Sequence, residues 1–507
     1  MPVRLVDDEP EEEQDDNSGG GGGNSGGGGF PGGGMLTMLL PLLFRYPKLL
    51  IVGLVLFGGY YLFSNGCGGG SKSKRGNADQ TELKTGMEMK QEIFDKAKVF
   101  EPLSANAPLP EAVDLESFCP KRSNQGRQGS CVGWASTYAA RTILQAQATG
   151  VDPNSTIFSP AYVYNQIHLE NCQGSYMLDA LKALQQGSVT LQDFPYHDDD
   201  CDRQPNAALK DRAAANRITG YNRLTEGGED YGIDVQGIKQ NLAQGAPVVI
   251  GAMVTESFQY LRGTRCWQPE SGDRVLGGHA MCVMGYDDSK EGGAFKIMNS
   301  WGADWGDRGF GWVRYRDFKA FCKEAYGLHP LPRKQADGKF DVKIGLIDNK
   351  SKGYIPLSLK SPNLFTSQPV AKNMRFKVEV NNSLECYTYV FGQETDNSSY
   401  VLFPYSPKFS PFCGITGSRM FPKGKSLSPD ATGNQDYMAI VVTKKELDYD
   451  ALNKKVSAAK GDYLAAFKSA LGRSLATKVT FKAENGMMHF TAEDKEEEAA
   501  VVIVVEI

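Results

Sequence analysis

The chain has 507 residues, of which 41% are hydrophobic and 23% are charged, as in globular proteins that bury a sizeable core. The formal net charge of −5 is small for this length, and no cluster of Lys and Arg alternates with aromatic residues, so nucleic acid is not an expected partner. Ten cysteines are too few for a scaffold built on disulfides, although they suffice for one or two bridges.

The first 34 residues have a low-complexity composition. An acidic run at 7–16 is followed by a stretch at 18–34 that consists mostly of glycine. Neither stretch can bury enough apolar surface to offset the loss of chain entropy on folding. Residues 1–34 are therefore predicted to be a disordered leader.

Residues 35–63 are mostly apolar and predict one transmembrane helix. The second apolar run, at 49–63, has 15 residues and no charge, which is fewer than the roughly 20 that a spanning helix needs. Arg45 and Lys48 precede this run, and their side chains can extend to the membrane interface. We therefore expect a single-pass membrane anchor.

The basic residues around this anchor bear on its orientation. Arg45 and Lys48 flank it closely on one side, and the basic residues at 72–75 lie farther from the other side. This arrangement favours a cytoplasmic N-terminal side, so the larger C-terminal part is expected to be extracytoplasmic. Two alternatives stay open, namely a buried core helix at 35–63 and lipidation at Cys67.

Residues 64–109 connect the anchor to the first globular part. The stretch at 64–80 is rich in Gly, Ser and Lys and predicts a flexible linker. The stretch at 82–100 offers one modest helix. We expect this helix to be a strut between anchor and domain, and the alternative is that it covers a cleft.

Cys131 stands in a context that favours a reactive thiol. It follows Ser130, whose hydroxyl is predicted to cap a helix by accepting a hydrogen bond from a backbone N–H. Apolar residues then recur at helical spacing, namely Trp134, Ala135, Tyr138, Ala139, Ile143 and Leu144. The first turn of a helix carries partial positive charge, which favours the thiolate. The alternative is a thiol that only packs in the core.

A histidine and an asparagine farther along the chain are candidate partners of this thiol. His279 begins the apolar run HAMCVMGY, which predicts a buried strand, and Asn299 ends the apolar run FKIM. An asparagine on a strand can accept from an imidazole N–H and fix its tautomer, and the indole of Trp301 can exclude water. Cysteine catalysis needs a thiolate, a base and a group that orients the base. Each residue taken alone is as well explained by packing.

Three segments, taken together and in order, resemble the papain family of cysteine peptidases. They are NQGRQGSC at 124–131, GGHAMCVMGYDD at 277–288 and IMNSWGADWGDRGFGWVRY at 297–315. Cys131 and His279 are 148 residues apart, a separation typical of this family. The resemblance extends over residues 110–332.

This resemblance implies a role for each matched residue. Cys131 would be the nucleophile, His279 the base and Asn299 the residue that orients the base. The side-chain amide of Gln125 would join the Cys131 N–H in binding the oxyanion. Further contacts with the substrate, or with the His–Asn pair, would come from Gly174, Ser175, Tyr176 and Trp301. The implied reaction is amide hydrolysis through a thioester acyl-enzyme, with no metal or cofactor.

The resemblance also implies an α+β fold of two lobes, one helical and one resembling a β-barrel, with the active site in the cleft between them. Met177, Gly251 and Gly278 match positions that often line the second substrate pocket, which implies a roomy apolar pocket. Gln128 stands where many relatives have a cysteine. Cys172 therefore lacks its usual partner, and both Cys172–Cys201 and Cys119–Cys201 are open alternatives.

The composition changes in residues 333–507. Short alternating apolar runs at 340–445 are separated by turn residues and predict the antiparallel strands of a β-sandwich. An amphipathic helix is predicted at 446–471, followed by further strands. This part loosely resembles modules attached to bacterial peptidases, so we expect an accessory domain that binds another protein or an envelope component. The alternative is a purely structural cap. Cys386 and Cys413 offer one more disulfide.

The sequence as a whole predicts a membrane-anchored cysteine endopeptidase that acts on peptide or protein substrates. Its catalytic domain is expected on the extracytoplasmic side. One alternative is a protein of the same fold that binds or scaffolds with little hydrolytic activity. Another is an acyltransferase or deamidase that uses the same thioester.

Overall fold

The computed structural model describes residues 2–8, 84–99, 109–225, 232–331, 339–414, 418–422, 424–459, 461–493 and 500–507. The predicted anchor at 35–63, Cys67 and the predicted linker at 64–80 lie outside the described residues. Among the helices that fall within the described ranges, every one is too short or too polar to cross a bilayer.

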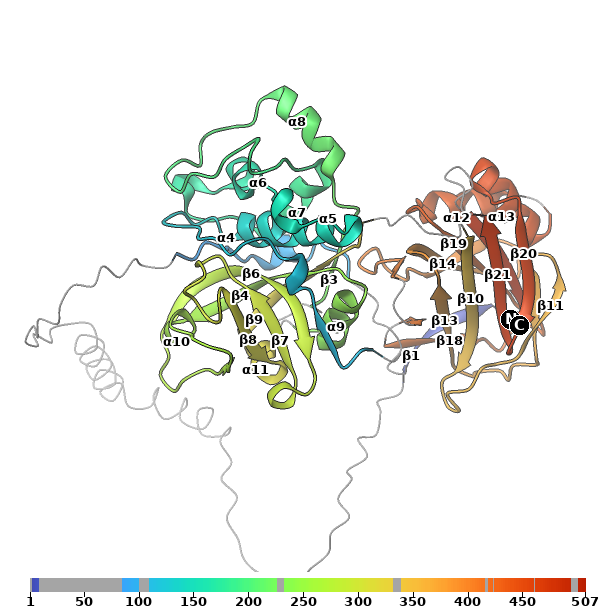
Figure 1. Cartoon of the computed structure of the whole chain (residues 1–507). Helices are drawn as coiled ribbons and strands as arrows, with labels where there is room; N and C mark the ends of the chain where they lie inside the picture. The colour runs from blue at the N-terminus through green and yellow to red at the C-terminus, as the bar shows by residue number, and fades with distance from the viewer. Residues whose placement is uncertain are drawn as a thin grey trace, which may run out of the picture. The chain divides into compact units, whose positions relative to one another are not determined.

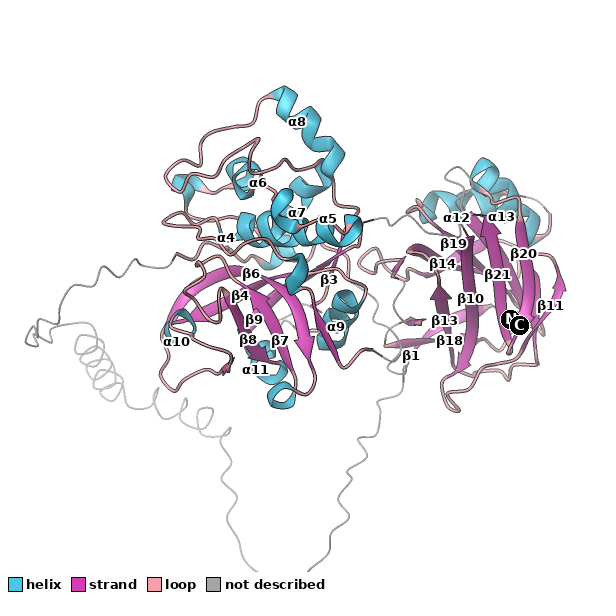
Figure 2. Ribbon diagram, viewed as in Figure 1, coloured by secondary structure: helices cyan, strands magenta, loops and turns pink. Residues whose placement is uncertain are grey.

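The first lobe of the two-lobed domain is helical (Figures 1 and 2). Its helices are α4 (Cys131–Gly133), a π-helical stretch (Trp134–Arg141), α5 (Thr142–Thr149), α6 (Pro160–Ile167), α7 (Met177–Gln186) and α8 (Ala207–Ala213). The first three run on without interruption, which confirms the predicted helix after Cys131. It ends at Gly150, which has a φ of 69° and occupies the left-handed region that favours glycine.

The second lobe is an eight-stranded sheet of order β3-β9-β4-β6-β7-β8-β5, with β2 paired to β6. Its strands are β2 (Ala112–Asp114), β3 (Tyr221–Arg223), β4 (Val248–Thr255), β5 (Cys266–Trp267), β6 (Val275–Asp287), β7 (Ala294–Met298), β8 (Phe310–Arg314) and β9 (Cys322–Leu328). Three helices accompany this sheet, namely α9 (Val235–Ala243), α10 (Glu256–Gln259) and α11 (Tyr315–Phe321). Both lobes contribute to one hydrophobic core.

The sheet register explains why two distant polar residues meet. β6 and β7 are antiparallel, with Cys282 opposite Met298. His279 lies three residues before Cys282 on β6, and Asn299 directly follows Met298 at the end of β7. Both side chains are therefore presented at the same edge of the sheet.

The segment at 84–99 differs from the predicted helix at 82–100. Only α3 (Gln91–Phe94) is helical, and residues 84–90 are mostly extended. The extended residues bond to the two-lobed domain through their backbone, which satisfies groups that a helix would otherwise pair internally. The predicted helix is thus reduced to a single turn.

The C-terminal part contains two seven-stranded sheets. One has the order β1-β18-β13-β10-β21-β20, with β17 paired to β13, and the other has the order β11-β12-β22-β19-β14-β15, with β16 paired to β14; β1 (Val3–Asp7) comes from the other end of the chain. The strands are β10 (Lys339–Asp348), β11 (Leu357–Ser361), β12 (Leu364–Ser367), β13 (Phe376–Asn382), β14 (Cys386–Gln393), β15 (Ser399–Phe403), β16 (Phe412–Cys413), β17 (Arg419–Phe421), β18 (Lys425–Pro429), β19 (Tyr437–Thr443), β20 (Val479–Glu484), β21 (Met487–Glu493) and β22 (Ala500–Glu506). Alternation along β19 shows how they pack. Ile440 faces the core shared by both sheets, and Val441 faces a second core shared with two helices.

Those two helices replace the single helix predicted at 446–471. They are α12 (Tyr449–Ala458) and α13 (Tyr463–Leu471). Gly461 has a φ of 122°, and the side chain of Asp462 accepts from the Ala465 N–H and so caps the second helix. A glycine followed by a capping residue therefore divides the predicted helix.

A strand from the other end of the chain completes the first sheet. β1 (Val3–Asp7) pairs antiparallel with β18, with Leu5 opposite Leu427. Val3 is only 1% exposed and belongs to the core between the sheets. The prediction of a disordered leader is therefore wrong for residues 2–8, because the apolar residues at every second position give this short stretch one face to bury.

Candidate active site

Cys131 lies at the start of its helix, and its side chain is completely buried. The backbone N–H groups of Ala280, Val132 and Cys131 itself face its sulfur. Ala280 directly follows His279, so the fold brings the helix start of one lobe against the histidine strand of the other. The Ser130 hydroxyl does not cap the helix as predicted, because it forms a 2.6 Å hydrogen bond with the Tyr196 hydroxyl instead.

His279 and Asn299 form the contact that the sequence predicts. The His279 Nε2–H donates to Asn299 Oδ1 at 2.8 Å, and the Ser300 N–H donates to the same oxygen at 2.7 Å. The imidazole stacks on the Trp301 ring at a centroid distance of 4.4 Å. Its Nδ1 is buried without a hydrogen-bond partner among the described residues. This nitrogen therefore carries a lone pair, and the Cys131 thiol forms no hydrogen bond with it in this state.

Burial keeps both candidate reactive groups neutral. It raises the pKa of the Cys131 thiol to about 12, against the lowering effect of the nearby backbone N–H groups. It also lowers the pKa of His279 to about 4, against the raising effect of the hydrogen bond with Asn299. The pair is thus a thiol and a neutral imidazole in this state, not a thiolate and an imidazolium.

The Gln125 side chain is fully buried and held at both ends of its amide. The Ser300 hydroxyl donates to Gln125 Oε1 at 2.6 Å, and Gln125 Nε2 donates to the Gln128 carbonyl at 3.0 Å. One amide hydrogen remains for another acceptor. Sequence reasoning missed Ser300, and the one signal for it is its position directly after Asn299.

Tyr196 is a second residue that sequence reasoning missed. Its hydroxyl donates to the Gln125 carbonyl at 2.6 Å and also bonds the Ser130 hydroxyl. Its ring meets the Trp134 ring edge-on at 5.0 Å. Tyr196 therefore joins the Gln125 loop to the residue that precedes Cys131. It lies in the segment FPYHDDDC at 194–201, which resembles the papain family but did not indicate this role.

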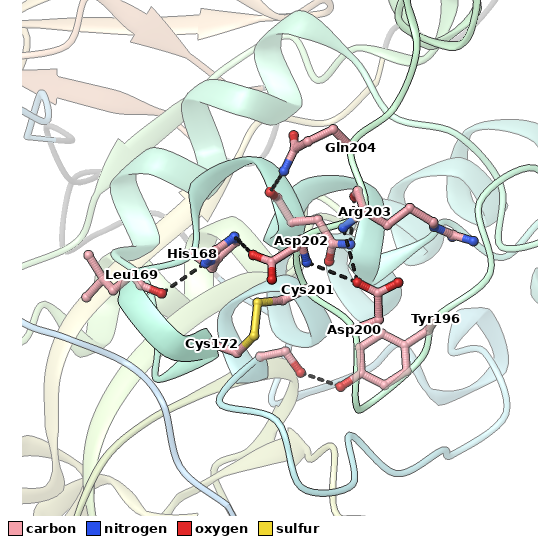
Figure 3. The surroundings of a disulfide bond; sticks show 11 residues. His168, Leu169, Cys172, Tyr196, Asp200, Cys201, Asp202, Arg203 and Gln204 are labelled. Atoms are coloured by element: carbon pink, nitrogen blue, oxygen red, sulfur yellow. Dashed lines mark hydrogen bonds and ion pairs between the residues drawn. A yellow bond between two sulfur atoms is a disulfide. The ribbon is translucent and has the colours of Figure 1, made fainter.

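A disulfide holds the loop that leads to Gly174. Of the two open alternatives, the structure contains Cys172–Cys201 (Figure 3). His168 and Asp202 lie beside it, with 3.7 Å between His168 Nε2 and Asp202 Oδ1. These two residues and Cys201 have metal-ligand spacing, but the Cys201 sulfur is already bonded to Cys172. The group is therefore not suited to bind a metal.

The predicted substrate-contacting residues contact the chain's own segment at 84–90. The Ser175 N–H donates to the Gly86 carbonyl at 3.0 Å, and the Glu88 N–H donates to the Ser175 carbonyl at 3.1 Å. These bonds form a parallel bridge centred on Met87. The Lys90 ammonium lies over the Tyr176 ring, 5.5 Å from its centre.

The opposite wall of the cleft bonds to the same segment. The Gly86 and Met87 N–H groups both donate to the Gly278 carbonyl, at 3.1 and 3.0 Å. The Trp301 Nε1–H donates to the Lys84 carbonyl at 3.0 Å. Residues 84–88 therefore lie across the region of Cys131, where the expected strut would have left the cleft open.

Two of the predicted pocket residues adjoin Met87, Gly251 at its side chain and Gly278 at its backbone carbonyl. A Cβ atom added to Gly251 would come within 2.3 Å of Met87 Cε, so this methyl group occupies the space that a side chain at 251 would fill. A Cβ atom added to Gly278 would lie 2.2 Å from the Met87 carbonyl. Met177, the third residue, is fully buried. The two glycines thus provide room for the segment.

Comparisons with known proteins agree with this geometry. Residues 109–326 match the sequence family described as papain family cysteine protease. This part of the chain is a papain family cysteine protease domain. The predicted cysteine peptidase is therefore confirmed, together with its α+β fold, and residues 109–326 are called the peptidase domain below.

Individual relatives each match about two fifths of the chain. Cysteine proteinase 3 of Entamoeba histolytica is 28% identical over 220 residues, which are 42% of this chain and 65% of that protein. Cathepsin K of Mus musculus is 30% identical over 210 residues, which are 40% of this chain and 59% of that protein. The chain thus spans about three fifths of the length of these two relatives.

Solved structures of cysteine proteases are similar to the same part of the chain. Xylellain from Xylella fastidiosa has 22% identity and a TM-score of 0.42, and covers 51% of this chain and 100% of its own. The bromelain protease from Ananas comosus, solved with the E64 inhibitor, has 18% identity and a TM-score of 0.36, and covers 44% of this chain and 100% of its own.

Proposed function

We propose that the chain is a cysteine endopeptidase in which Cys131 is the nucleophile, His279 the base and Asn299 the residue that orients the base. The observation that carries this proposal is the state of His279. Its Nε2–H is engaged by Asn299 Oδ1 at 2.8 Å, so the neutral ring has its lone pair on Nδ1. The helix start that bears Cys131 adjoins Ala280, the next residue.

These groups support a complete reaction. The Cys131 thiol transfers its proton to His279 Nδ1, and the thiolate attacks the substrate carbonyl carbon. The resulting oxyanion accepts from the Cys131 N–H and from the free amide hydrogen of Gln125. His279 then returns the proton to the departing amine, which leaves a thioester on Cys131. Water, deprotonated by His279, attacks the thioester and restores the thiol.

The space beside Gly251 that the Met87 side chain occupies, called the Met87 pocket, supports a substrate class for this reaction. The pocket accepts an apolar side chain that is unbranched at Cβ, because the absent side chain of Gly251 leaves the space that the Met87 methyl group fills. We propose that the enzyme favours peptides with Met or Leu at the position that enters this pocket. A β-branched residue carries its bulk next to the backbone and is expected to fit less well.

The enzyme in this state is latent. The Lys84 and Gly86 carbonyls are directed at Trp301 and Ser175, and neither is placed on the Gln125 amide. The segment thus occupies the cleft without presenting a carbonyl for attack. Removal of residues 84–88 from the cleft would also return water to Cys131 and His279. Water favours the thiolate and imidazolium forms that the reaction needs.

Labelling with an electrophile that traps activated thiols tests the proposal. The substitution Gly86→Val is made in the full chain to displace residues 84–88 from the cleft. A Cβ atom at position 86 would lie 2.2 Å from the Gly129 carbonyl oxygen, which leaves no room for the valine side chain. A peptidyl epoxide should label Gly86→Val once, at Cys131, and Gly86→Val/Cys131→Ala not at all. Hydrolysis of an unfolded protein should follow the same pattern. Equal labelling of the two variants would contradict the assignment.

The same experiment separates the alternatives. Labelling of Cys131 without hydrolysis would favour the binding or scaffolding role. A product that joins the acyl part of a peptide to an added amine would favour acyl transfer. Because the thioester is shared, Cys131→Ala abolishes both reactions and serves as their common control.

We further propose that the chain is attached to a membrane through residues 35–63, with the peptidase domain on the extracytoplasmic side. The Cys172–Cys201 disulfide supports an oxidising compartment. The test is fractionation of cells that express the full chain, followed by protease treatment of intact cells. Recovery in the soluble fraction would contradict membrane attachment, and protection from protease would contradict the assigned side.

A further inference from the structure

The end of the cleft-covering segment lies between the peptidase domain and the β-rich domain, residues 339–507. On one side, the Arg223 N–H of β3 donates to the Lys98 carbonyl at 2.7 Å. On the other side, the Val99 N–H donates to the Lys408 carbonyl, and the Ser410 N–H donates to the Val99 carbonyl at 2.8 Å. The backbone of residues 98 and 99 thus bonds to two different domains.

These bonds give Val99 a strand-like position with a neighbour on each side. It forms one parallel bridge with Arg223 and another with Phe409. Its side chain is 8% exposed, so the contact excludes water. An ion pair between Lys98 Nζ and Glu446 Oε1 adds a charge contact with the β-rich domain.

The stretch between the cleft and Val99 is also bound. Phe94 in α3 is 1% exposed and meets the Tyr326 ring at 6.1 Å. The Arg223 guanidinium, which is buried, forms a 3.0 Å ion pair with Asp95. The segment is therefore held from the cleft onwards. Among its described residues, Val99 bonds to the β-rich domain through its backbone, and Lys98 contacts that domain through its side chain.

We propose that the β-rich domain is a clamp that keeps the segment at 84–99 over Cys131. Binding of Val99 by Lys408–Ser410 opposes dissociation of the whole segment, because a bound end keeps the rest at high local concentration. Cutting the chain at 100–108 would then leave the cleft covered. Opening requires that the β-rich domain releases residues 98–99. The inference gives the proposed peptidase its regulation and so rests on the proposed function.

Amide hydrogen exchange tests the clamp without any activity. The full chain carrying Cys131→Ala is compared with the same chain carrying Val99→Pro, which removes the N–H that bonds to Lys408 but leaves the Lys98 carbonyl for Arg223. Exchange at the Gly86 and Met87 amides should rise about fivefold, as expected for the loss of one hydrogen bond. Val99→Thr keeps the N–H and the side-chain shape, and should stay within about twofold.

Reversing the charges of the Lys98–Glu446 ion pair gives a second test that does not use proline. Lys98→Glu should raise exchange at Gly86 and Met87 by about twofold, and Lys98→Glu/Glu446→Lys should restore it. The clamp is contradicted if Val99→Pro accelerates exchange at Ser410 but leaves Gly86 and Met87 unchanged. In that case the segment is held in the cleft independently of the β-rich domain.

Activity provides a separate measurement. A recognition site for a specific protease is inserted between residues 103 and 104 in chains that retain Cys131. After cleavage, Val99→Pro should hydrolyse peptides several-fold faster than the chain with Val99. Equal and strong activation of both would overturn the clamp but support the peptidase. Faster exchange in Val99→Pro without hydrolysis in any variant would support the clamp and overturn the proposed function.

Discussion

Tyr196 offers a measurable test of how the oxyanion site is positioned. Its hydroxyl ties the Gln125 carbonyl to the Ser130 hydroxyl, with both distances 2.6 Å. In the opened enzyme, Tyr196→Phe should lower kcat about tenfold, because the Gln125 loop loses a fixed point. KM should change little.

Alkylation of Cys131 by iodoacetamide separates this role from a general loss of structure. The reaction needs a thiolate but no oxyanion donor, so its rate in Tyr196→Phe should stay within about twofold of the parent. Gln125→Ala is the matched variant and should show the same split. A parallel fall in alkylation and hydrolysis would instead indicate a disordered site.

Because the His279 imidazole is buried, we expect the covering of the cleft by residues 84–88 to depend on pH. Burial lowers the pKa of His279 to about 4 in the covered state, below its usual 6.5. The opened state therefore binds more protons as the pH falls from about 6.5 to about 4, and this favours opening by up to about 3 kcal/mol. The covered state is fully favoured between about pH 6.5 and the ordinary thiol pKa of 9.0, and it is lost progressively below pH 6.5.

Amide exchange at Gly86 and Met87, corrected for the intrinsic effect of pH, should accelerate across this window. His279→Gln has no group that titrates there, and its corrected exchange should be independent of pH between about 4 and 7. The same acceleration in His279→Gln would assign the effect to another group.

Residue types and their order made the three candidate catalytic residues predictable. A cysteine at a helix start, a histidine at the start of an apolar run and an asparagine at the end of another carry their chemistry in the sequence itself. Tyr196 and Ser300 act through contacts that exist only after distant loops have folded. Ser130 shows the same limit, because its hydroxyl prefers the Tyr196 hydroxyl to the helix N–H groups that its position suggests.

At the scale of elements, the extended stretch at 84–90 depends on close backbone approaches. Gly86 lies so near the neighbouring chain that an added Cβ atom would meet the Gly129 carbonyl at 2.2 Å. Gly86→Val should displace the stretch and raise the rate of Cys131 alkylation at least tenfold, because burial of the thiol would be relieved.

Thr85→Val is a suitable control for that change. Thr85 is half-buried, and valine has the same β-branched shape as threonine, so this change removes the hydroxyl without forcing the stretch apart. Its substitution should leave the alkylation rate within about twofold. If Gly86→Val also leaves the rate unchanged, the stretch does not control access to Cys131.

Helices and strands whose apolar residues recur at a regular spacing were predictable. Stretches whose conformation depends on hydrogen bonds with distant residues were not. The helix after Cys131 and the strands of the β-rich domain have periodic apolar residues. The stretch at 84–90 has no such period, because its bonds lie on Gly278, Ser175 and Trp301. The predicted helix at 446–471 has the right apolar positions, but Gly461 and Asp462 divide it.

At the scale of the whole molecule, residues 2–8 contribute to the stability of the β-rich domain. Val3 is 1% exposed, and Arg4 pairs with both carboxylate oxygens of Glu394. Val3→Asp should therefore lower the free energy of unfolding of this domain by about 2 kcal/mol or more. Scanning calorimetry of the full chain measures the shift.

Asp7→Ser is the control for that measurement. The Asp7 side chain is 85% exposed and forms an ion pair with Lys425 on the surface, so its loss should change stability by less than about 1 kcal/mol. A β-rich domain that unfolds at the same temperature in Val3→Asp and in the parent would show that β1 is dispensable. The pairing itself could not be read from the sequence, because β1 and β18 are separated by more than 400 positions.

The pairing of β1 with β18 closes the polypeptide into a ring. Residues 2–8 and the residues from 84 onwards are joined to one folded body, so the stretch between them has its two ends in the same place. A bilayer divides space into two compartments, and a path that begins and finishes in one of them crosses the boundary an even number of times. Where this strand pairing forms, membrane attachment through 35–63 therefore leaves residues 2–8 on the same side of the bilayer as the peptidase domain, and protease treatment of intact cells should reach both or neither.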